Sequence, residues 1–366
     1  MGVISFARGV PAPECLPVSE LADCARAAIE RDGASVLSYG PGGGYAPLRE
    51  WIAARHGVEP SRVVITSGSL QGFVFLVEQL VKPGSRVLVE APTYDRPLKI
   101  LNRLGAEIVG LPMDDNGLQV DALERTLAAG EKPAFLYTIA TFQNPSGRTL
   151  STERRRRIAE LAREHELLVL EDDPYGLVRY EGEAPPTIFE LEGGTNVVYA
   201  SSFSKTIAPG VRVGYFVLPP ALAAQIEALA VSTYISPPFL TQAAVYEFVS
   251  RGLFEPNLER VTGLLGARRD AMLAALEEHM PEGATWSRPE GGYFIWLDLP
   301  HEAGDLLARA EAAGVTFVQG TDFFADGSGT RSLRLAFSFV SVDEIAEGVS
   351  RLAGLLRGAP APASTL

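Results

Sequence analysis

The sequence predicts an α/β fold in which a large domain, built on a mostly parallel β-sheet covered by helices, is joined to a smaller α+β domain. Short apolar runs of strand length alternate with helical patterns through the first two-thirds of the 366 residues. This alternation is typical of a parallel sheet covered on both faces. After a long amphipathic stretch that starts near residue 255, shorter strands with an alternating pattern follow. A chain of this length suggests either one large domain with an elaborated subdomain or two domains that share a cleft.

The predicted strands of the large sheet are six apolar runs, each followed by a turn or a helical pattern. They are VVIT (63–66), RVLVEA (86–91), AFLYTIA (134–140), LLVLED (167–172), VVYAS (197–201) and GYFVL (214–218). We expect all of them to run parallel. The runs GGYFIWLDL (291–299), VTFVQG (315–320) and SLRLAFS (332–338) predict the smaller sheet.

Changes of pattern along the chain predict its division into domains. We expect 1–38 to be an N-terminal segment packing with the small domain, 39–265 to be the large domain, and 266–358 to be the small domain. The last residues, 359–366, belong to a stretch rich in Pro, Ala and Ser and predict a disordered tail.

Composition limits the possible partners and the compartment. The net charge of −13 repels nucleic-acid phosphates and anionic membrane surfaces, so neither is an expected partner. Two cysteines, Cys15 and Cys24, do not form a CxxC pair and suit a reducing compartment. No signal peptide and no apolar run of roughly 18 residues is visible. The expectation is a cytoplasmic protein.

Several common catalytic motifs are absent from the sequence. There is no GxSxG, HExxH or GxxxxGK(S/T) motif, and GPGGGY (40–45) lacks the GxGxxG spacing. The four histidines are scattered, so no metal site is expected. The basic run Arg154–Arg157 follows Ser151 on a predicted helix, and we expect it to form a solvated face.

Polar residues instead gather directly after the predicted strands. In an open parallel sheet these positions line one crevice outside the carboxyl edge, where ligands bind. Each group alone resembles an ordinary turn or helix start, but their succession on neighbouring strands indicates a binding site. The groups are SGSLQG (67–72), Tyr94, Asn144, Asp172 with Tyr175, and Ser202, Ser204, Lys205 and Arg212.

One ligand satisfies the whole set. A phosphate fits the helix start SGSLQG together with serines and an arginine. An aromatic ring fits stacking by Tyr94, and a ring nitrogen that must stay protonated fits Asp172. A phenolic oxygen fits donors from Asn144 and Tyr175. An aldehyde fits Lys205, whose amine can form a Schiff base (aldimine). The ligand with these groups is pyridoxal 5′-phosphate.

At this point the sequence resembles a known family. The motifs SFSKTIAPGVRVGY (202–215), TFQNPSGRTLS (141–151), EDDPYG (171–176) and YGPGGGYAPLRE (39–50) are similar to those of fold-type I aminotransferases of class I/II. The nearest resemblance is to the 2-aminoadipate and kynurenine aminotransferase branch, which is related to the effector domains of MocR-type regulators. The resemblance covers nearly the whole chain.

The resemblance implies roles for individual residues. Catalysis would involve Lys205, Asp172 and Tyr94, while Arg334, Asn144 and Gly9 would hold the substrate carboxylate. Tyr39 would reach the cofactor phosphate of a neighbouring subunit, which implies a homodimer with shared sites. The implied cofactor-binding residues are Ser69, Leu70, Tyr94, Asn144, Asp172, Tyr175, Ser202, Ser204, Lys205, Arg212 and the partner's Tyr39.

Departures from the family pattern concern the substrate. Arg8 stands where the family commonly has glycine, and Gln319 stands in place of a proline. Relatives also usually carry a longer N-terminal arm with a helix that covers the substrate. We expect Arg8 to face the entrance left open in its absence and to contact substrate.

The predicted activity is transfer of an amino group between an L-amino acid and a 2-oxo acid, with 2-oxoglutarate as the expected acceptor, through the Lys205 aldimine (an aminotransferase, EC 2.6.1.-). Other reactions on the same cofactor, namely β-elimination, racemisation and decarboxylation, stay open. A third alternative is a non-catalytic domain that senses an effector. Turnover that depends on 2-oxoglutarate would distinguish an aminotransferase from such a sensor.

Overall fold

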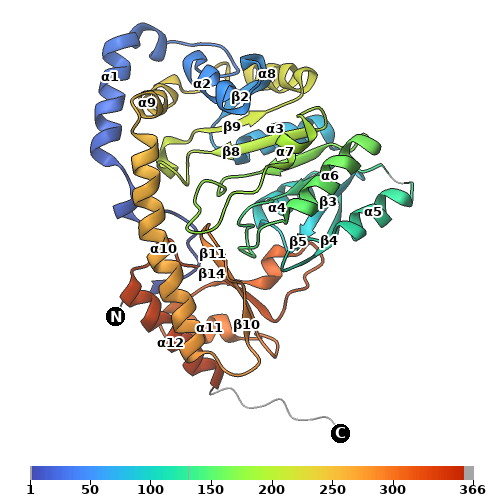
Figure 1. The fold of residues 1–366 in the computed structure, drawn as a ribbon, viewed down its shortest axis with the longest axis vertical. Coiled ribbons are helices and arrows are strands. Elements are labelled where there is room, and N and C mark those ends of the chain that lie inside the picture. Colours follow the sequence, from blue (N-terminus) through green and yellow to red (C-terminus); the bar gives the residue numbers. More distant parts are fainter. Residues whose placement is uncertain (1, 131, 358–366) are drawn as a thin grey trace.

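The computed structural model describes residues 2–130 and 132–357, and an eight-stranded sheet forms the centre of its large domain (Figure 1). The strand order is β2-β9-β8-β7-β6-β3-β4-β5. Strands β8, β7, β6, β3 and β4 are parallel neighbours, which confirms the mostly parallel sheet. The strands are Val63–Thr66 (β2), Arg86–Ala91 (β3), Glu107–Asp114 (β4), Gly117–Leu118 (β5), Phe135–Thr138 (β6), Val169–Asp172 (β7), Val197–Ser202 (β8) and Gly214–Val217 (β9).

Strand β9 departs from the expectation, because it runs antiparallel to both of its neighbours, β8 and β2. A parallel strand needs a crossover connection of a dozen or more residues, usually a helix. The link between β8 and β9 contains only the short 3₁₀ helix Pro209–Val211, so the chain turns back on itself. This tight link carries Lys205 and Arg212. Strands β4 and β5 were not predicted; Gly110, Pro112 and exposed side chains interrupt the apolar pattern of β4.

Helices cover both faces of the large sheet (Figure 1). Side chains alternate along each strand, so Leu88 packs into one apolar layer while Val87 and Val89 pack into the other. Apolar residues on both faces therefore give the unbroken apolar runs seen in the sequence. The helices of this region are Val18–Val36 (α1), Ala46–His56 (α2), Ser69–Leu80 (α3), Asp95–Arg103 (α4), Val120–Ala128 (α5), Thr152–Glu164 (α6), Ile188–Glu192 (α7), Pro220–Tyr234 (α8) and Phe239–Ser250 (α9).

The small domain is built on an antiparallel sheet of order β10-β11-β14-β13. A two-stranded parallel pair, β1 with β12, lies beside it. Its elements are Ile4–Ser5 (β1), Thr285–Trp286 (β10), Phe294–Asp298 (β11), Leu306–Ala312 (α11), Val315–Thr316 (β12), Val318–Gln319 (β13), the 3₁₀ helix Gly320–Phe323 (η4), Ser332–Ala336 (β14) and Val342–Arg357 (α12).

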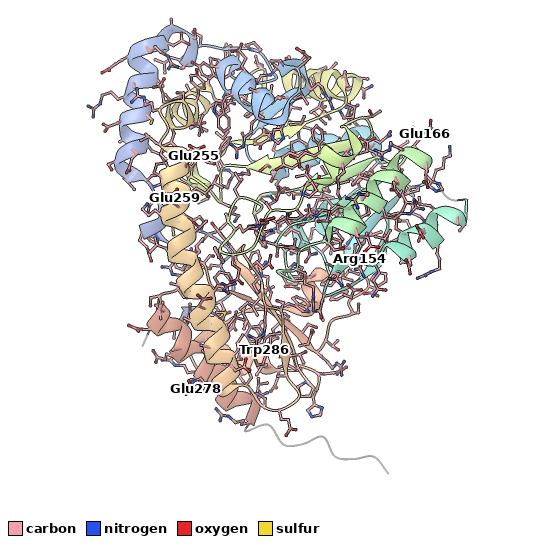
Figure 2. All side chains as sticks on the ribbon, in the orientation of Figure 1. Arg154, Glu166, Glu255, Glu259, Glu278 and Trp286 are labelled. Carbon is pink, nitrogen blue, oxygen red and sulfur yellow. The ribbon has the colours of Figure 1, made fainter. Side chains whose placement is uncertain are left out.

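One long helix, α10 (Phe254–His279), joins the two domains and runs across the predicted boundary at 265 (Figure 1). Leu265 packs into a core layer of the large sheet, whereas Met272 and Leu276 pack into the core of the small domain. Figure 2 labels exposed acidic side chains along this helix, Glu255 and Glu259 toward one end and Glu278 toward the other.

The N-terminal segment contacts both domains. Ile4 and Phe6 belong to the small-domain core, while Cys24 and Ala28 of α1 pack into a core layer of the large domain. The proposed boundaries remain a prediction, and the expected disordered tail lies outside the described residues. Among the residues described, no helix combines the length and the apolar character needed to cross a bilayer.

Candidate active site

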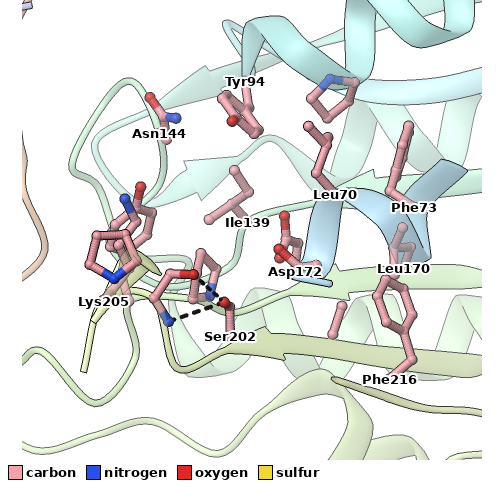
Figure 3. A pocket seen from close by; sticks show the side chains of 18 of the residues that line it. Leu70, Phe73, Tyr94, Ile139, Asn144, Leu170, Asp172, Ser202, Lys205 and Phe216 are labelled. Atoms are coloured by element: carbon pink, nitrogen blue, oxygen red, sulfur yellow. Dashed lines mark hydrogen bonds between the residues drawn. The ribbon is translucent and has the colours of Figure 1, made fainter. Parts of the chain in front are cut away.

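A cavity of ≈ 270 Å³ lies at the carboxyl ends of the central strands (Figure 3). Because parallel strands end at the same edge of the sheet, residues far apart in sequence meet there. The residues proposed from sequence that line it are Ser69, Leu70, Tyr94, Asn144, Asp172, Tyr175, Ser202, Ser204, Lys205 and Arg212. Gly9, Arg8, Arg334 and Tyr39 are not among the lining residues, and their positions are described below.

One end of the cavity is formed by the start of helix α3. The first residues of a helix have no earlier carbonyl in the same helix to bond, so the N–H groups of Ser69 and Leu70 are available to an anion. Gly68 precedes them with φ 83°, a conformation that favours glycine. Gly214 of β9 packs so close that a Cβ there would collide with the backbone of Gly68 and Ser69. Two glycines thus hold the helix start against the sheet.

Hydroxyl and guanidinium groups complete this end of the cavity. The Ser202 hydroxyl donates to Ser204 Oγ at 2.8 Å (Figure 3). Arg212 Nη1 lies 3.5 Å from Ser204 Oγ, and Arg212 Nη2 donates to Ser67 O at 2.9 Å. The Arg212 side chain is otherwise exposed. Helix N–H groups, hydroxyls and a guanidinium together are the donors that a phosphate prefers.

Lys205 also lines the cavity and is held by hydrogen bonds at its amine and at its backbone. Its Nζ donates to Gly9 O at 2.7 Å, and the Tyr293 hydroxyl donates to the carbonyl of Lys205 at 3.0 Å. Burial, together with the positive charges of Arg334 and Arg212, lowers the pKa of Lys205 to about 8. A lysine that loses its proton this readily becomes a nucleophilic amine near neutral pH.

Asp172, the last residue of β7, presents a partly unpaired carboxylate. Its Oδ2 accepts a hydrogen bond from the Tyr137 hydroxyl at 2.8 Å, whereas its buried Oδ1 has no partner among the described residues. Burial raises the pKa of Asp172 to about 7; the bond from Tyr137 opposes this rise and the charge of Asp173 adds to it. A buried acceptor without a donor is costly, so a cationic N–H from a ligand fits this position.

Asp173, the neighbouring aspartate, is fully engaged elsewhere. Its Oδ2 accepts from the Tyr199 hydroxyl at 2.9 Å, and its Oδ1 accepts from the backbone N–H of Gly176 at 2.8 Å. Asp173 does not line the cavity that Asp172 lines. Of the two consecutive aspartates, only Asp172 is available to a ligand in this cavity.

Two tyrosines and an asparagine supply neutral donors. Burial raises the pKa of Tyr94 to about 12 and raises that of Tyr175 as well, so both hydroxyls stay protonated. Figure 3 shows Tyr94 and Asn144 on one side of the cavity and Ser202 on the other, with Asp172 between them. Tyr94 immediately precedes α4, which sets its ring at the edge of the cavity.

Arg334 lies behind Asn144 on strand β14. It is buried, with Nη1 donating to Asn144 Oδ1 and Nη2 to Ala7 O, both at 2.9 Å. Its guanidinium lies over the rings of Phe294 and Phe323, and its Nε has no partner among the described residues. No carboxylate of the described residues forms an ion pair with it. A buried guanidinium with no carboxylate at ion-pair distance favours binding of an anionic ligand.

The other predicted residues lie outside the cavity lining. Arg8 is exposed, and its guanidinium stacks over the Phe339 ring at 4.6 Å from the ring centre. The Tyr39 side chain is 82% exposed. Gly9 is packed so that a Cβ would collide with the Phe294 ring, and its carbonyl is the acceptor for Lys205.

Arg155 shows where sequence reasoning failed. It belongs to the run expected to form a solvated face, yet it is fully buried, with Nη1 3.5 Å from Glu171 Oε1. It also donates to the carbonyls of Leu150 and Ala140, which connects strand β7 to the loop that carries Asn144. Arg154 does pair at the surface, with Asp114. The helical spacing of Arg155, Ile158 and Ala162 places Arg155 on the buried face of α6, a signal that could have identified it.

The residues present fit pyridoxal 5′-phosphate. The α3 start with its serines and arginine suits the phosphate, the unpaired Asp172 Oδ1 suits a ring N–H, and the Lys205 amine suits the aldehyde. Together with the mostly parallel sheet and the small α+β domain, this site defines a pyridoxal-phosphate-dependent transferase of fold type I.

Comparison with known proteins identifies the family. Residues 4–352 match the family model for class I and II aminotransferases, so the chain belongs to this family and is a pyridoxal-phosphate-dependent aminotransferase. It is 39% identical to 2-aminoadipate transaminase of Thermus thermophilus, over 98% of this chain and 91% of that protein. It is 37% identical to aromatic-amino-acid aminotransferase 1 of Thermococcus litoralis, over 97% of this chain and 88% of that protein. The solved structure of Pyrococcus horikoshii kynurenine aminotransferase, in complex with PMP, superposes with a TM-score of 0.94 and 37% identity, covering 98% of this chain and 91% of that one.

Proposed function

We propose that this aminotransferase moves an amino group between an L-amino acid and a 2-oxo acid, with 2-oxoglutarate as the acceptor, and that Arg334 binds the α-carboxylate that both substrates share. The observation that carries the proposal is the buried guanidinium of Arg334, which has no carboxylate partner among the described residues and lies 2.9 Å from Asn144 of the cavity. Carboxylates match the planar fork of arginine, which can donate two parallel hydrogen bonds.

The proposed cofactor contacts divide the cavity into three parts. The N–H groups of Ser69 and Leu70 bind the phosphate, together with Ser202, Ser204 and Arg212 from the β8–β9 link. Tyr94 stacks on the ring, Asp172 pairs with the ring nitrogen, and Asn144 and Tyr175 donate to the phenolic oxygen. When bound, the cofactor supplies an aldehyde that links to amines and a ring that withdraws electrons from the substrate Cα.

The chain's own catalytic groups then have defined tasks. Lys205 Nζ, as a free amine, would accept the proton from the substrate Cα as a general base and then donate it again as a general acid. Its lowered pKa, about 8, makes both steps feasible near neutral pH. Asp172 keeps the ring nitrogen protonated, and Arg334 with Asn144 and Gly9 fixes the carboxylate end of the substrate.

A panel of L-amino acids, each assayed with 2-oxoglutarate, tests the activity directly. We expect at least one donor to be consumed with formation of glutamate in equal amount. Ammonia release, inversion at Cα or CO₂ release without glutamate would instead indicate elimination, racemisation or decarboxylation. Ligand binding without any turnover across the panel would contradict an enzymatic role.

Substitutions of Arg334 and Arg8 should affect substrate selectivity in different ways. Arg334→Lys should raise KM for every amino acid and oxo acid by roughly one to two decades, because lysine cannot replace a bidentate contact to a shared carboxylate. Arg8→Gly should weaken acidic substrates more than neutral ones, because the exposed cation of Arg8 attracts a second carboxylate. The measurement is kcat/KM for one acidic and one aliphatic donor in each variant. A changed ratio in Arg334→Lys with an unchanged ratio in Arg8→Gly would mean that the two roles are reversed.

We also propose that the protein is a homodimer with shared active sites. We propose the cytoplasm as its compartment. Tyr39 is 82% exposed, and Leu37 (67%) and Ile235 (60%) are further exposed apolar residues. The backbone N–H of Gly40 donates to Ser236 Oγ at 3.0 Å, so these exposed residues come from neighbouring segments, and contiguous exposed apolar surface is typical of association surfaces. Two buried, free cysteines suit a reducing compartment.

Mixing two inactive variants tests whether sites are shared. We expect Tyr39→Phe and Lys205→Ala homodimers each to be impaired and activity to rise when their subunits exchange. In the mixed dimer one site carries both lesions and the other carries neither. As a control for subunit exchange, wild-type protein is mixed with the Lys205→Ala variant alone. Absence of complementation after exchange is confirmed, with a clearly impaired Tyr39→Phe parent, would contradict a shared site.

A further inference from the structure

Two buried tyrosines flank the pair of aspartates at the end of β7. Tyr137 lies on β6 and Tyr199 on β8, the two strands that pair with β7 on either side. The Tyr137 hydroxyl donates to Asp172 Oδ2 at 2.8 Å, and the Tyr199 hydroxyl donates to Asp173 Oδ2 at 2.9 Å. Each tyrosine therefore donates a hydrogen bond to a different aspartate, because consecutive residues of a strand point to opposite faces of the sheet.

We propose that Tyr137 is a positioning residue of the cofactor site: by donating to Asp172 Oδ2 it fixes the carboxylate and leaves Oδ1 as the acceptor for the ring N–H. This inference rests on the proposed role of Asp172. Tyr137 is completely buried, and the Asp172 Oδ1 atom is buried without a partner among the described residues. Tyr137 does not line the cavity, so in this proposal it acts only through Asp172.

The hydrogen bond also controls the charge of Asp172. The titratable groups around this carboxyl are Tyr137 from β6, Asp173 next to it on β7, Tyr94 and Tyr175 from the loops, and Lys205, which lines the same cavity. Of these, Tyr137 is the only one that donates a hydrogen bond to it, while Asp173 repels its negative charge. Without the Tyr137 hydroxyl, Oδ2 would also be unpaired, and Asp172 would take up a proton at a higher pH. A protonated Asp172 no longer attracts a protonated ring nitrogen.

Tyr137→Phe tests the proposal, and Tyr199→Phe is its matched control because it removes the same atom from a buried tyrosine next to Asp173. We would label aspartate carboxyls with ¹³C and titrate the apo-protein by NMR, assigning Asp172 from the signal missing in Asp172→Asn. In Tyr137→Phe the Asp172 signal should titrate roughly one pH unit higher, and the Kd for pyridoxal phosphate should rise about tenfold, as for a lost hydrogen bond to a charged group. Tyr199→Phe should raise neither value.

A second measurement needs no mutation. Incorporation of 3-fluorotyrosine gives a more acidic hydroxyl, which is a stronger donor, so the Asp172 signal should titrate at a lower pH than in the unlabelled protein. This keeps the proposal open to test even where removal of the Tyr137 hydroxyl lowers the stability of the fold.

The possible outcomes distinguish the proposed role of Tyr137 from the proposed role of Asp172. Wild-type titration and affinity in Tyr137→Phe, together with weakened binding in Asp172→Asn, would overturn the role of Tyr137 and leave that of Asp172 intact. Equal effects of the two tyrosine variants would show a general packing role and would also overturn it. Unchanged affinity and kcat in Asp172→Asn would contradict the proposed function of Asp172 itself.

Discussion

Replacing Lys205 with alanine should abolish steady-state transamination while the protein still folds. The other lysines of the chain, Lys82, Lys99 and Lys132, are exposed, so none of them can take over from an amine inside the cavity. The loss removes both the group that links to the cofactor and the group that moves the proton. We expect a fall in kcat of roughly 10⁴-fold or more, beyond the upper range of general acid–base catalysis alone.

Borohydride reduction of the loaded enzyme followed by peptide mapping locates the linked lysine. With only four lysines in the chain, the peptides are readily told apart. The pyridoxyl label should be found on Lys205, and the matched variant Lys99→Ala should keep both label and activity. A label on any of the three exposed lysines would refute the assignment. Circular dichroism of Lys205→Ala checks that the fold is retained.

Asp172→Asn should retain the fold but lose most of its activity. A neutral amide does not hold the ring nitrogen protonated, so the ring withdraws electrons less strongly from the reacting bond. The barrier should rise by several kcal/mol, which corresponds to a fall in kcat on the order of 10²-fold or more. Single-turnover measurements with saturating cofactor separate this loss from weaker cofactor binding. Asp173→Asn is the control, because Asp173 is bonded to Tyr199 and Gly176 and does not line the cavity.

The stability of the apo-protein gives an independent check on Asp172. Burial raises the pKa of this carboxyl to about 7, above its ordinary value near 3.8, so the folded state holds its proton more tightly than the unfolded chain. The cost of ionising it in the fold is absent below the ordinary value and fully present above pH 7. Apo Asp172→Asn should therefore melt at a temperature no lower than the apo wild type at pH 8. Normal kcat in Asp172→Asn with a large loss in Asp173→Asn would show that the wrong aspartate was chosen.

Much of the site could be predicted from sequence because it follows from the strand pattern. Apolar runs identified the central strands, and parallel strands end at one edge of the sheet, so the polar residues that follow them must meet. Asp172 and Lys205 therefore line one cavity, because each lies at or just after the carboxyl end of its strand. The helix start at Ser69 could be read in the same way, from small residues placed between a strand and a helix.

The direction of individual strands and the burial of individual side chains were harder to predict from the sequence. The run that forms β9 reads like its parallel neighbours, and only the short link before it makes it antiparallel. Helical spacing places Arg155 on the apolar face of α6, but its partners, Glu171 of β7 and the carbonyls of Leu150 and Ala140, are known only from the packing. Contacts of this kind depend on how elements pack together, which a local pattern does not contain.

The sequence by itself indicated the class of fold, the cofactor and ten of the residues that line the cavity, because strand periodicity and the residues after each strand are local properties. Only the tertiary structure showed that a tyrosine on the neighbouring strand holds Asp172, while Asp173 is bonded to Tyr199 and does not line the cavity. It also decided that Arg334 is buried beside Asn144, with no acidic partner among the described residues. The physical reason is that orientation and pairing depend on the register between strands and on domain packing, both of which join residues distant in sequence.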